Sequence, residues 1–264
     1  MHSPMMEPTN ATYGFCRDIF TILEDFKPTH IFCAFDLTGK SFRREVFPEY
    51  KMNRSKAPDD LQEQIPFVEE VITAFDIPVL KCEGFEADDV IATVTASASP
   101  TNIVTVVTSD KDCRQLLSDH VRLYNIRKKE FYTAESLKND WGIAPEQCVD
   151  FQSLCGDSSD NIPGARGIGP KTATELLQKY GSLEGIYKNL FDIPGKRRDN
   201  LAESKHNVDL SKRLVTLRKD APVEIPEAPY AGYNRDKVMA MFKRFGFDSL
   251  YAKLAPTPHK LALY

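Results

Sequence analysis

Carboxylate side chains gather at close spacing in three short segments of the chain. The segments are F-E-A-D-D at 85–89, T-S-D-K-D at 108–112 and G-D-S-S-D-N at 156–161. Each by itself has an ordinary explanation, as acids that favour a helix N-terminus, cap an element or form a polar turn. Together they suggest a shared site, because crowded carboxylates raise one another's pKa unless cations lie between them. Oxygen ligands of this kind suit Mg²⁺, with Mn²⁺ as a substitute.

The predicted metal ligands are these acids and one more that ends an apolar run: Asp36, Glu86, Asp88, Asp89, Asp110, Asp112, Asp157 and Asp160. Two divalent ions held by such a set can activate a water and stabilise the leaving oxygen of a phosphodiester. The six cysteines are far apart and form no C-x-x-C pair, which argues against a zinc site or a disulfide framework. With five histidines and no matching nucleophile, covalent acyl transfer has no support either.

A glycine-rich segment, G-A-R-G-I-G-P-K-T-A at 164–173, is the most specific pattern in the chain. Glycines let the backbone approach a ligand closely, and the free N–H groups of a helix start point at an anion. The pattern indicates a helix-hairpin-helix that contacts backbone phosphates with little sequence preference. Its predicted contact residues are Gly164, Gly167, Gly169, Lys171 and Thr172.

A third segment, residues 41–54, interleaves aromatic and cationic residues. Its predicted roles are phosphate stabilisation by Lys51, Arg44 and Arg54, and DNA contacts by Arg43 and Tyr50, the latter by stacking on a displaced base. Read alone, the segment is better explained as an ordinary surface loop and helix. The formal net charge is −4, yet residues 38–57 carry six basic residues, Lys40 included, against Glu45 and Glu49. Local basic stretches of this kind are compatible with a polyanionic partner.

The order of the expected elements explains how these residues could meet. Apolar runs at 30–35, 78–81, 103–108 and 121–124 predict strands, and amphipathic patterns at 62–75 and 86–98 predict helices between them. The alternation favours an α/β domain with a mostly parallel sheet. Asp36 and Asp110 then follow the carboxyl ends of strands, where active sites of such sheets form. Helices are expected at 145–155, 170–180 and 182–190, and the phenylalanine-rich end of the chain is expected to pack back on the body.

The composition excludes some classes of protein. No apolar run approaches the roughly 20 residues of a membrane span, and the N-terminus lacks the basic start and apolar stretch of a signal peptide. Scattered cysteines are typical of reduced thiols. We therefore expect a cytoplasmic protein with no membrane partner.

In its motifs the chain resembles the 5′→3′ exonuclease domain at the N-terminus of bacterial DNA polymerase I, a relative of the flap endonucleases. That family has an acid after an F-D strand, then F-R-x-E, Y-K-x-x-R, E-A-D-D, T-x-D-K-D and G-D-x-S-D-N-x-P-G-x-x-G-I-G. The counterparts here are Asp36 and residues 42–45, 50–54, 86–89, 108–112 and 156–169. The resemblance extends from about Glu7 to about Leu254.

The resemblance implies a PIN-like α/β fold with a helix-hairpin-helix region, two Mg²⁺ ions shared by the acids, and K⁺ at the hairpin. It implies a nuclease core at 1–142, with a helical arch at about 38–66 that carries Lys51 and Arg54. A DNA-binding region at 143–220 and a C-terminal segment at 221–264 would follow. The expected substrate is DNA with 5′ flaps, nicks or ends, cut as a monomer in primer removal and repair near the nucleoid. A DNA polymerase is the expected partner, in cis or in trans.

One departure from the family lies at the beginning of the chain. The family opens with a strand that ends in Asp-Gly, whose aspartate joins the metal site, whereas Met1-His-Ser-Pro leads directly to the segment matching at Glu7. We expect weaker metal binding and lower stability than in a version extended upstream. Two alternatives to a full nuclease therefore stay open: a catalytically impaired module that binds DNA structures, and a related ribonuclease.

Overall fold

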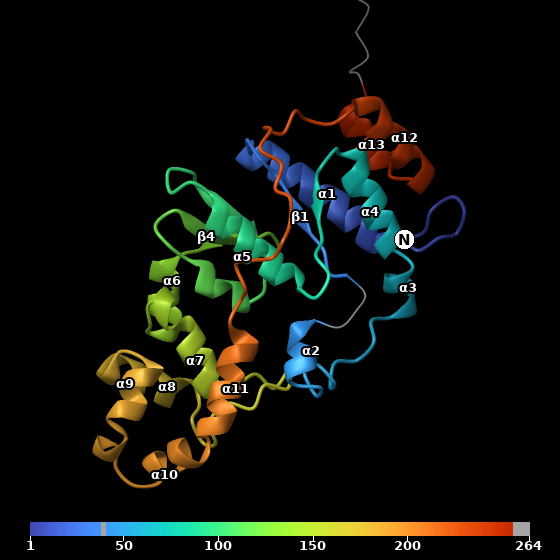
Figure 1. The fold of residues 1–264 in the computed structure, drawn as a ribbon. Helices are drawn as coiled ribbons and strands as arrows, with labels where there is room; N and C mark the ends of the chain where they lie inside the picture. Colours follow the sequence, from blue (N-terminus) through green and yellow to red (C-terminus); the bar gives the residue numbers. More distant parts are fainter. Residues whose placement is uncertain (38–40, 256–264) are drawn as a thin grey trace, which may run out of the picture. The chain divides into compact units, whose positions relative to one another are not determined.

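The computed structural model describes residues 1–37 and 41–255, which form two compact units. The first unit comprises 1–33, 55–80 and the chain from Glu224 onwards, and the second comprises 34–54 and 81–223. Each unit therefore joins segments that are far apart in the sequence (Figure 1). Lys40 and the start of the segment expected to form the arch lie outside the described residues. The linear division at 142 and 220 stays a prediction.

The first unit is helical. It contains α1 (Asn10–Phe26), α3 (Asp59–Gln62), α4 (Ile65–Ala74), α12 (Arg235–Phe245) and α13 (Asp248–Leu254). The rings of Phe20, Phe75 and Phe242 meet at its centre with centroids 5.2–6.5 Å apart. The buried amide of Gln64 accepts the N–H groups of Ala11 and Thr12 and so joins α4 to the start of α1. Phe242, Phe245, Phe247 and Leu250 are buried, and Tyr251 is half-buried.

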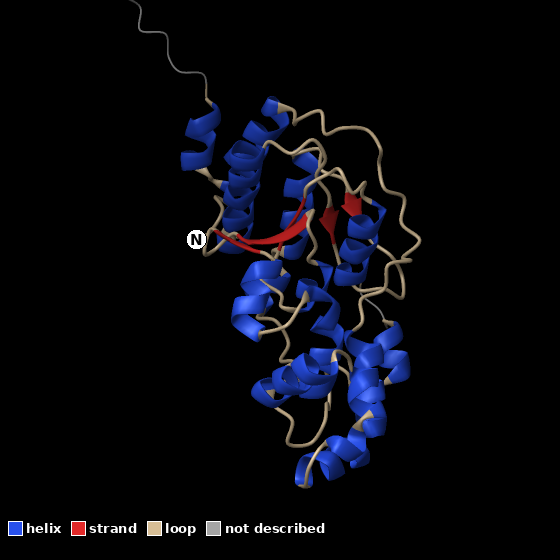
Figure 2. Cartoon of the chain, turned by 90° about the vertical axis from the view of Figure 1, so that its left-hand side faces the viewer, coloured by secondary structure: helices blue, strands red, loops and turns tan. Residues whose placement is uncertain are grey.

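All four expected strands are present; three are shorter than predicted, and the fourth extends one residue further, to Asn125. β1 (Cys33–Ala34) pairs with β2 (Val79–Leu80), and β3 (Val104–Val107) lies parallel to β4 (Val121–Asn125). A fifth strand, β5 (Glu130–Tyr132), pairs antiparallel with β4 and was not predicted, because its three half-exposed residues carry no burial pattern. The described strands form one pair and one three-stranded sheet of order β3-β4-β5, so the parallel sheet is small (Figure 2).

The helices of the second unit surround one large core. They are α2 (Phe42–Val46), α5 (Ala87–Ser97), the 3₁₀ turn η1 (Asp112–Leu116), α6 (Ala134–Trp141), η2 (Pro145–Gln147), α7 (Cys148–Cys155), α8 (Pro170–Tyr180), α9 (Leu183–Lys188), η3 (Leu190–Asp192), α10 (Lys196–Glu203) and α11 (Lys205–Val215). The core extends from Val106 and Leu123 of the sheet to Leu177 and Leu201 of the helices. The helix expected at 145–155 begins as η2, and α6 was missed although Thr133 caps its start and Gly142 its end.

The expectation of a helical arch at Lys51 and Arg54 is wrong for this structure. Helix α2 ends at Val46, residues 48–53 form successive turns, and 54–58 have no regular structure. Pro48 and Pro58 interrupt the pattern, and Lys51 itself has a positive φ of 58°. Both cations are therefore carried by a folded loop. Among the described helices, none has the length and apolarity required to span a membrane.

Candidate active site

Six of the eight predicted metal ligands line one cavity of about 570 Å³ in the second unit. The six are Asp36, Glu86, Asp88, Asp110, Asp112 and Asp160, and the wall also contains Tyr50, Lys51, Arg54 and Lys111. These residues come from the ends of β1 and β3, the start of α5, the turn η1, and the loops after α2 and α7. The polar edges of separate elements thus converge, as expected beyond the carboxyl ends of strands.

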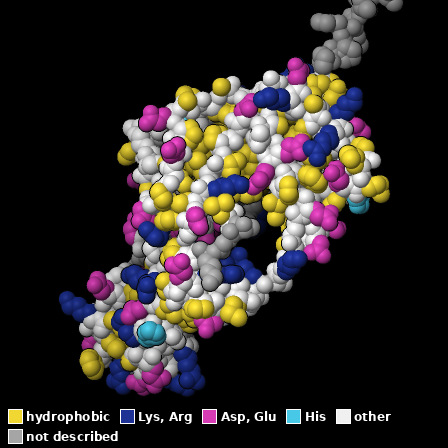
Figure 3. Space-filling view, turned by 45° about the vertical axis from the view of Figure 1, so that its right-hand side comes forward, with side chains coloured by type: hydrophobic (Ala, Val, Ile, Leu, Met, Phe, Trp, Pro, Cys, Tyr) yellow, Lys and Arg dark blue, Asp and Glu magenta, His cyan; other side chains and the backbone are white. Residues whose placement is uncertain are grey.

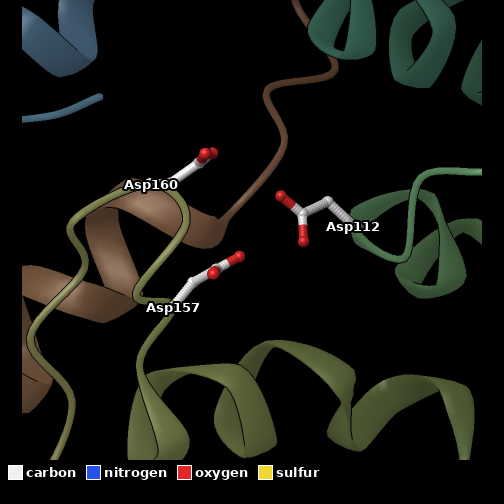
Figure 4. A group of neighbouring side chains, drawn as sticks. All are labelled: Asp112, Asp157 and Asp160. Atoms are coloured by element: carbon white, nitrogen blue, oxygen red, sulfur yellow. The ribbon is translucent and has the colours of Figure 1, made fainter. Parts of the chain in front are cut away.

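Asp112, Asp157 and Asp160 form the tightest carboxylate group. One oxygen from each lies within 4.8 Å of the other two. Figure 4 shows the three side chains directed into the same space, Asp112 from one side and the other two from a single loop. Carboxylates at this spacing provide the hard oxygen ligands of a Mg²⁺ or Mn²⁺ site, so the residues present fit a divalent ion.

The loop that holds Asp157 and Asp160 is fixed by its own backbone. The N–H of Asp157 donates to the carbonyl of Ile162 at 2.9 Å, and the N–H of Ile162 donates back at 2.7 Å. Ser159 donates its N–H and hydroxyl to Asp157 Oδ1. A Cβ at Gly164 would collide with the backbone of Gly156, so both positions require glycine and the loop closes on itself.

Asp36 and Asp110 each accept a hydrogen bond from a backbone N–H group near another acid. Asp36 accepts the N–H of Ala87 at 2.6 Å, which connects it to the start of α5. Asp110 accepts the N–H of Asp112. Burial, together with the nearby charge of Asp110, raises the pKa of Asp88 to about 6. Burial and the charges of Asp110 and Asp157 raise the pKa of Asp112 to about 7. Such crowding of like charges is relieved by a bound cation.

Four cations of the chain already neutralise part of this cluster, and Arg43 lies 3.7 Å from Glu86. Lys51 lies 2.9 Å from Glu86 and 3.9 Å from Asp160, and Arg54 donates two hydrogen bonds to Asp160. Lys111 lies 2.9 Å from Asp157. Burial would raise the pKa of Glu86, but the neighbouring cations hold it below its usual value. The pKa of Asp157 is likewise lowered against the effect of burial, by hydrogen bonds from Ser159 and Lys111.

Lys111 was not among the predicted site residues. Its signal was in the sequence, because it stands between the acids of T-S-D-K-D and must share their position. Its place in the wall of the cavity makes it a third cation within reach of a bound phosphate, beside Lys51 and Arg54.

Arg43 lines the inner wall of the cavity and forms a buried ion pair with Asp89, which lies behind it. Asp89 is 0% exposed and Arg43 is 2% exposed, and the guanidinium binds both carboxylate oxygens at 2.7 and 2.8 Å. Asp89 also accepts the N–H groups of Glu86 and Arg218, while Arg43 donates to the carbonyl of Leu214. The hydrogen-bonding capacity of both groups is used within the protein, which favours a structural role over metal or DNA contact.

Tyr50 is more buried than a base-stacking role requires, and Arg44 lies outside the cavity. Tyr50 is buried, and its hydroxyl donates to Glu86 and Asp160, so its ring is not free to stack on a base. Burial and the charge of Glu86 raise its pKa far above the usual value. Arg44 is exposed and does not line the cavity. The helix α2 thus directs Arg43 inward and its neighbour outward.

The glycine-rich segment forms a hairpin that leads into α8. Gly164 is buried in the contact with Gly156, whereas Gly167 and Gly169 are exposed, with φ of 72° at Gly167. Pro170 opens α8, so the helix start and the exposed Lys171 are accessible to an anion, with Thr172 half-buried beside them. Lys188, Lys196 and Arg197 of α9 and α10 are exposed. Basic side chains lie among acidic ones in the lower part of the view in Figure 3.

Comparison with known families matches most of the chain. Residues 1–142 match the model of the 5′-3′ exonuclease N-terminal resolvase-like domain, and residues 143–236 match the 5′-3′ exonuclease C-terminal SAM fold. DNA polymerase I of Bacillus subtilis is 42% identical over 254 residues, which are 93% of this chain but 29% of that protein. A 5′-3′ exonuclease of Aquifex aeolicus is 38% identical over 221 residues, 83% of this chain and 75% of that protein. The chain thus spans about 30% of the length of the polymerases that it matches.

Solved structures share the fold at lower sequence identity. A flap endonuclease of bacteriophage T5, in a complex with DNA and metal ions, aligns with a TM-score of 0.70 and 21% identity over 94% of this chain and 90% of that one. The catalytic core of Rad2 with a DNA substrate aligns with a TM-score of 0.59 and 19% identity over 97% and 87%. These likenesses confirm the predicted α/β architecture with a helical, SAM-like second region.

Proposed function

Since this chain belongs to the 5′-3′ exonuclease family, we propose that it is a structure-specific DNA 5′-nuclease. It would act as a 5′→3′ exonuclease and flap endonuclease in primer removal and repair. The observation that carries the proposal is the convergence of six acids and four cations on one cavity. The cavity combines ligands for divalent metal with groups that bind phosphate, and hydrolysis of a phosphodiester needs both.

The metal site is proposed to hold two Mg²⁺ ions, with Mn²⁺ as a substitute. Asp112, Asp157 and Asp160 would hold one ion, and Asp36, Asp88 and Asp110 would contribute to the other, with Glu86 between the two groups. When bound, such ions lower the pKa of a water and stabilise charge on the leaving oxygen. Asp89 is left out of this set because Arg43 and two backbone N–H groups occupy its oxygens.

The cations of the cavity are proposed to change partner when substrate is bound. Lys51 is 19% exposed and points at carboxylates that a metal ion would neutralise. Once the carboxylates coordinate metal, Lys51, Arg54 and Lys111 can turn toward the scissile phosphate, which is the strongest remaining anion nearby. Arg44 lies outside the cavity, and a contact with a more distant phosphate is the role left for it.

The hairpin at 164–173 is proposed to bind the phosphates of duplex DNA beside the cut. Exposed N–H groups at the start of α8 and the side chains of Lys171 and Thr172 supply contacts that depend on backbone charge and not on base sequence. A K⁺ ion at this hairpin, action as a monomer, a DNA polymerase as partner and a cytoplasmic location belong to the same proposal.

The edge of the small sheet offers a place for a further strand. Within the described residues β3 pairs with β4 alone, so one edge of β3 carries unpaired backbone groups. A strand ending in Asp-Gly at that edge would add a carboxylate next to Asp110. We propose that a strand of this kind would strengthen metal binding, because its carboxylate would join those already in place.

A cleavage assay tests the proposed function. A 5′-labelled DNA flap is incubated with the protein and Mg²⁺, and in parallel with a chelator. Cutting near the junction is expected only with Mg²⁺, and Asp110→Asn should abolish it while DNA binding persists. Asp76→Asn, an exposed aspartate of the first unit, is the matched control and should cut normally.

Each alternative function has a distinct outcome in the same assay. Retarded migration of the flap without cleavage in Mg²⁺ would identify a DNA-structure-binding module. Faster cutting of a matched RNA flap than of the DNA flap would identify a ribonuclease.

A further inference from the structure

Gln152 is a buried glutamine whose side chain meets the carboxylate group directly. It belongs to α7, is 5% exposed, and donates from Nε2 to Asp112 Oδ1 at 2.5 Å. Its other amide atom, Oε1, is buried and has no hydrogen-bond partner among the described residues. A buried acceptor without a partner costs free energy, so the side chain is held in this place at the expense of stability.

The contact with Asp112 explains why Oε1 of Gln152 has no hydrogen-bond partner among the described residues. A carboxylate accepts hydrogen bonds and does not donate them, so only the amide N–H₂ can face Asp112. The carbonyl end of Gln152 must then point into the protein, where no donor is provided for it. An apolar residue at position 152 would leave no unsatisfied atom, yet the sequence has a glutamine there. This indicates that the role of the side chain is its hydrogen bond to Asp112.

The helix of Gln152 also leads to the other two acids. Helix α7 ends at Cys155, and Asp157 and Asp160 follow in the loop that it leads into (Figure 4). Asp112 belongs to η1, forty positions earlier in the chain. The bond from Gln152 therefore joins the carboxylate of one segment to the element that positions its two partners.

A second glutamine, Gln115, holds the backbone of Asp112. Gln115 donates to the carbonyl of Asp112 at 3.0 Å and to the carbonyl of Val215 at 2.9 Å. Gln115 therefore fixes the backbone of η1 against the end of α11, while Gln152 fixes the direction of the carboxylate. Among the described residues, Gln152 is the only side chain with a hydrogen bond to an oxygen of that carboxylate.

We propose that Gln152 is a positioning residue for the metal site: it orients Asp112 so that its oxygen meets those of Asp157 and Asp160 around one divalent ion. The proposal rests on the proposed function, because it requires that these acids hold metal. Outer partners of metal ligands commonly change metal affinity by about 10- to 100-fold when they are removed.

The test measures Mn²⁺ binding to the DNA-free protein by electron paramagnetic resonance of the unbound ion. Gln152→Met keeps the length of the side chain but removes both the donor and the orphaned acceptor. We expect Mn²⁺ to bind about tenfold more weakly. The melting temperature in a chelator should change little, because removal of the unsatisfied acceptor offsets the loss of the hydrogen bond to Asp112. A role in stability alone would lower the melting temperature and leave the affinity unchanged.

Two further variants make the result specific. Ser153→Ala changes the next buried residue of α7, whose hydroxyl donates to the carbonyl of Val149, and should leave Mn²⁺ affinity unaltered. Gln152→Asn keeps the amide but is too short to reach Asp112, so it should weaken Mn²⁺ binding as Gln152→Met does. If Gln152→Met does not fold, the Mn²⁺ affinity of Gln152→Asn tests the proposal in its place.

A double-mutant cycle links the effect to its partner. In an Asp112→Asn background, Gln152→Met should cause little further loss of Mn²⁺ affinity. Equal affinity in the unaltered protein and in both Gln152 variants would overturn the proposal and leave the proposed function standing. Absence of Mn²⁺ binding to the unaltered protein would overturn both.

Discussion

At the scale of single residues, the carboxylates of the site differ in how their charge is balanced. Glu86, Asp157 and Asp160 each have a cation of the chain at hydrogen-bond distance. Asp88 and Asp112 have none in the described structure, and their pKa values are raised to about 6 and about 7. Asp88 and Asp112 therefore carry the electrostatic strain of the metal-free protein.

This strain predicts how stability depends on pH. Because the folded pKa of Asp112 lies above its unfolded value of about 4, its ionisation costs stability progressively between about pH 4 and pH 7. Asp112→Asn should thus raise the melting temperature of the metal-free protein at pH 8, by roughly 3 °C or more. At pH 4 the two proteins should melt at nearly the same temperature. Thermal unfolding in a chelator at both pH values measures this, and an equal difference at both would contradict it.

The sequence predicted well which segments would meet at the site. It predicted less well which way each side chain would point. The segment Phe42-Arg43-Arg44-Glu45 contains two adjacent arginines, and pattern alone does not say which of them faces inward. The structure buries Arg43 against Asp89 and leaves Arg44 exposed. Similarly, E-A-D-D places three acids within one turn, so the helix must direct them differently: Glu86 and Asp88 toward the cavity, Asp89 behind it.

At the scale of elements, the hairpin at 164–173 followed most directly from sequence, because glycine and proline fix the backbone locally. The strands were located but their ends were not, since pairing partners decide where a short strand stops. The segment after α2 was expected to be helical and is a series of turns, because its prolines and contacts with the Asp160 loop override the family pattern. Lys51 donates its backbone N–H to the carbonyl of Asp160, a contact that no local pattern contains.

The hairpin predicts a salt-dependent binding defect. Lys171→Gln removes one exposed positive charge at the start of α8. We expect weaker binding to duplex DNA of every sequence, and a slope of log affinity against log salt that is smaller by about 1. Fluorescence anisotropy at several salt concentrations measures this, with the exposed Lys253→Gln of α13 as control. An unchanged slope would exclude Lys171 from phosphate contact.

At the scale of the whole molecule, family membership accounts for the fold class, and the two compact units show how it is built. The first unit draws on three stretches of sequence, so its core of aromatic rings could be anticipated only in part, from the phenylalanines near the C-terminus. Contacts between stretches more than 200 residues apart, such as Phe20 with Phe242, leave no trace in local periodicity.

Among the described strands, β3 has a neighbour on one side alone, and this predicts the effect of an added strand. An N-terminal extension containing an apolar strand that ends in Asp-Gly should raise the melting temperature by about 4 °C or more and strengthen Mn²⁺ binding. The same extension ending in Asn-Gly separates the two contributions: it should raise the melting temperature but not the metal affinity. Equal melting temperatures and affinities for the extended and unextended proteins would contradict both.

The cations within the cavity have a practical consequence for handling the protein. Lys51, Arg54 and Lys111 occupy three of the carboxylates when no metal is present. Chelation therefore leaves a cluster that is still partly neutral, and the loops of Asp157 and Asp160 keep their hydrogen bonds to the chain. Preparation and storage in EDTA should preserve the fold while DNA stays uncut, and return to Mg²⁺ should start the reaction without a refolding step.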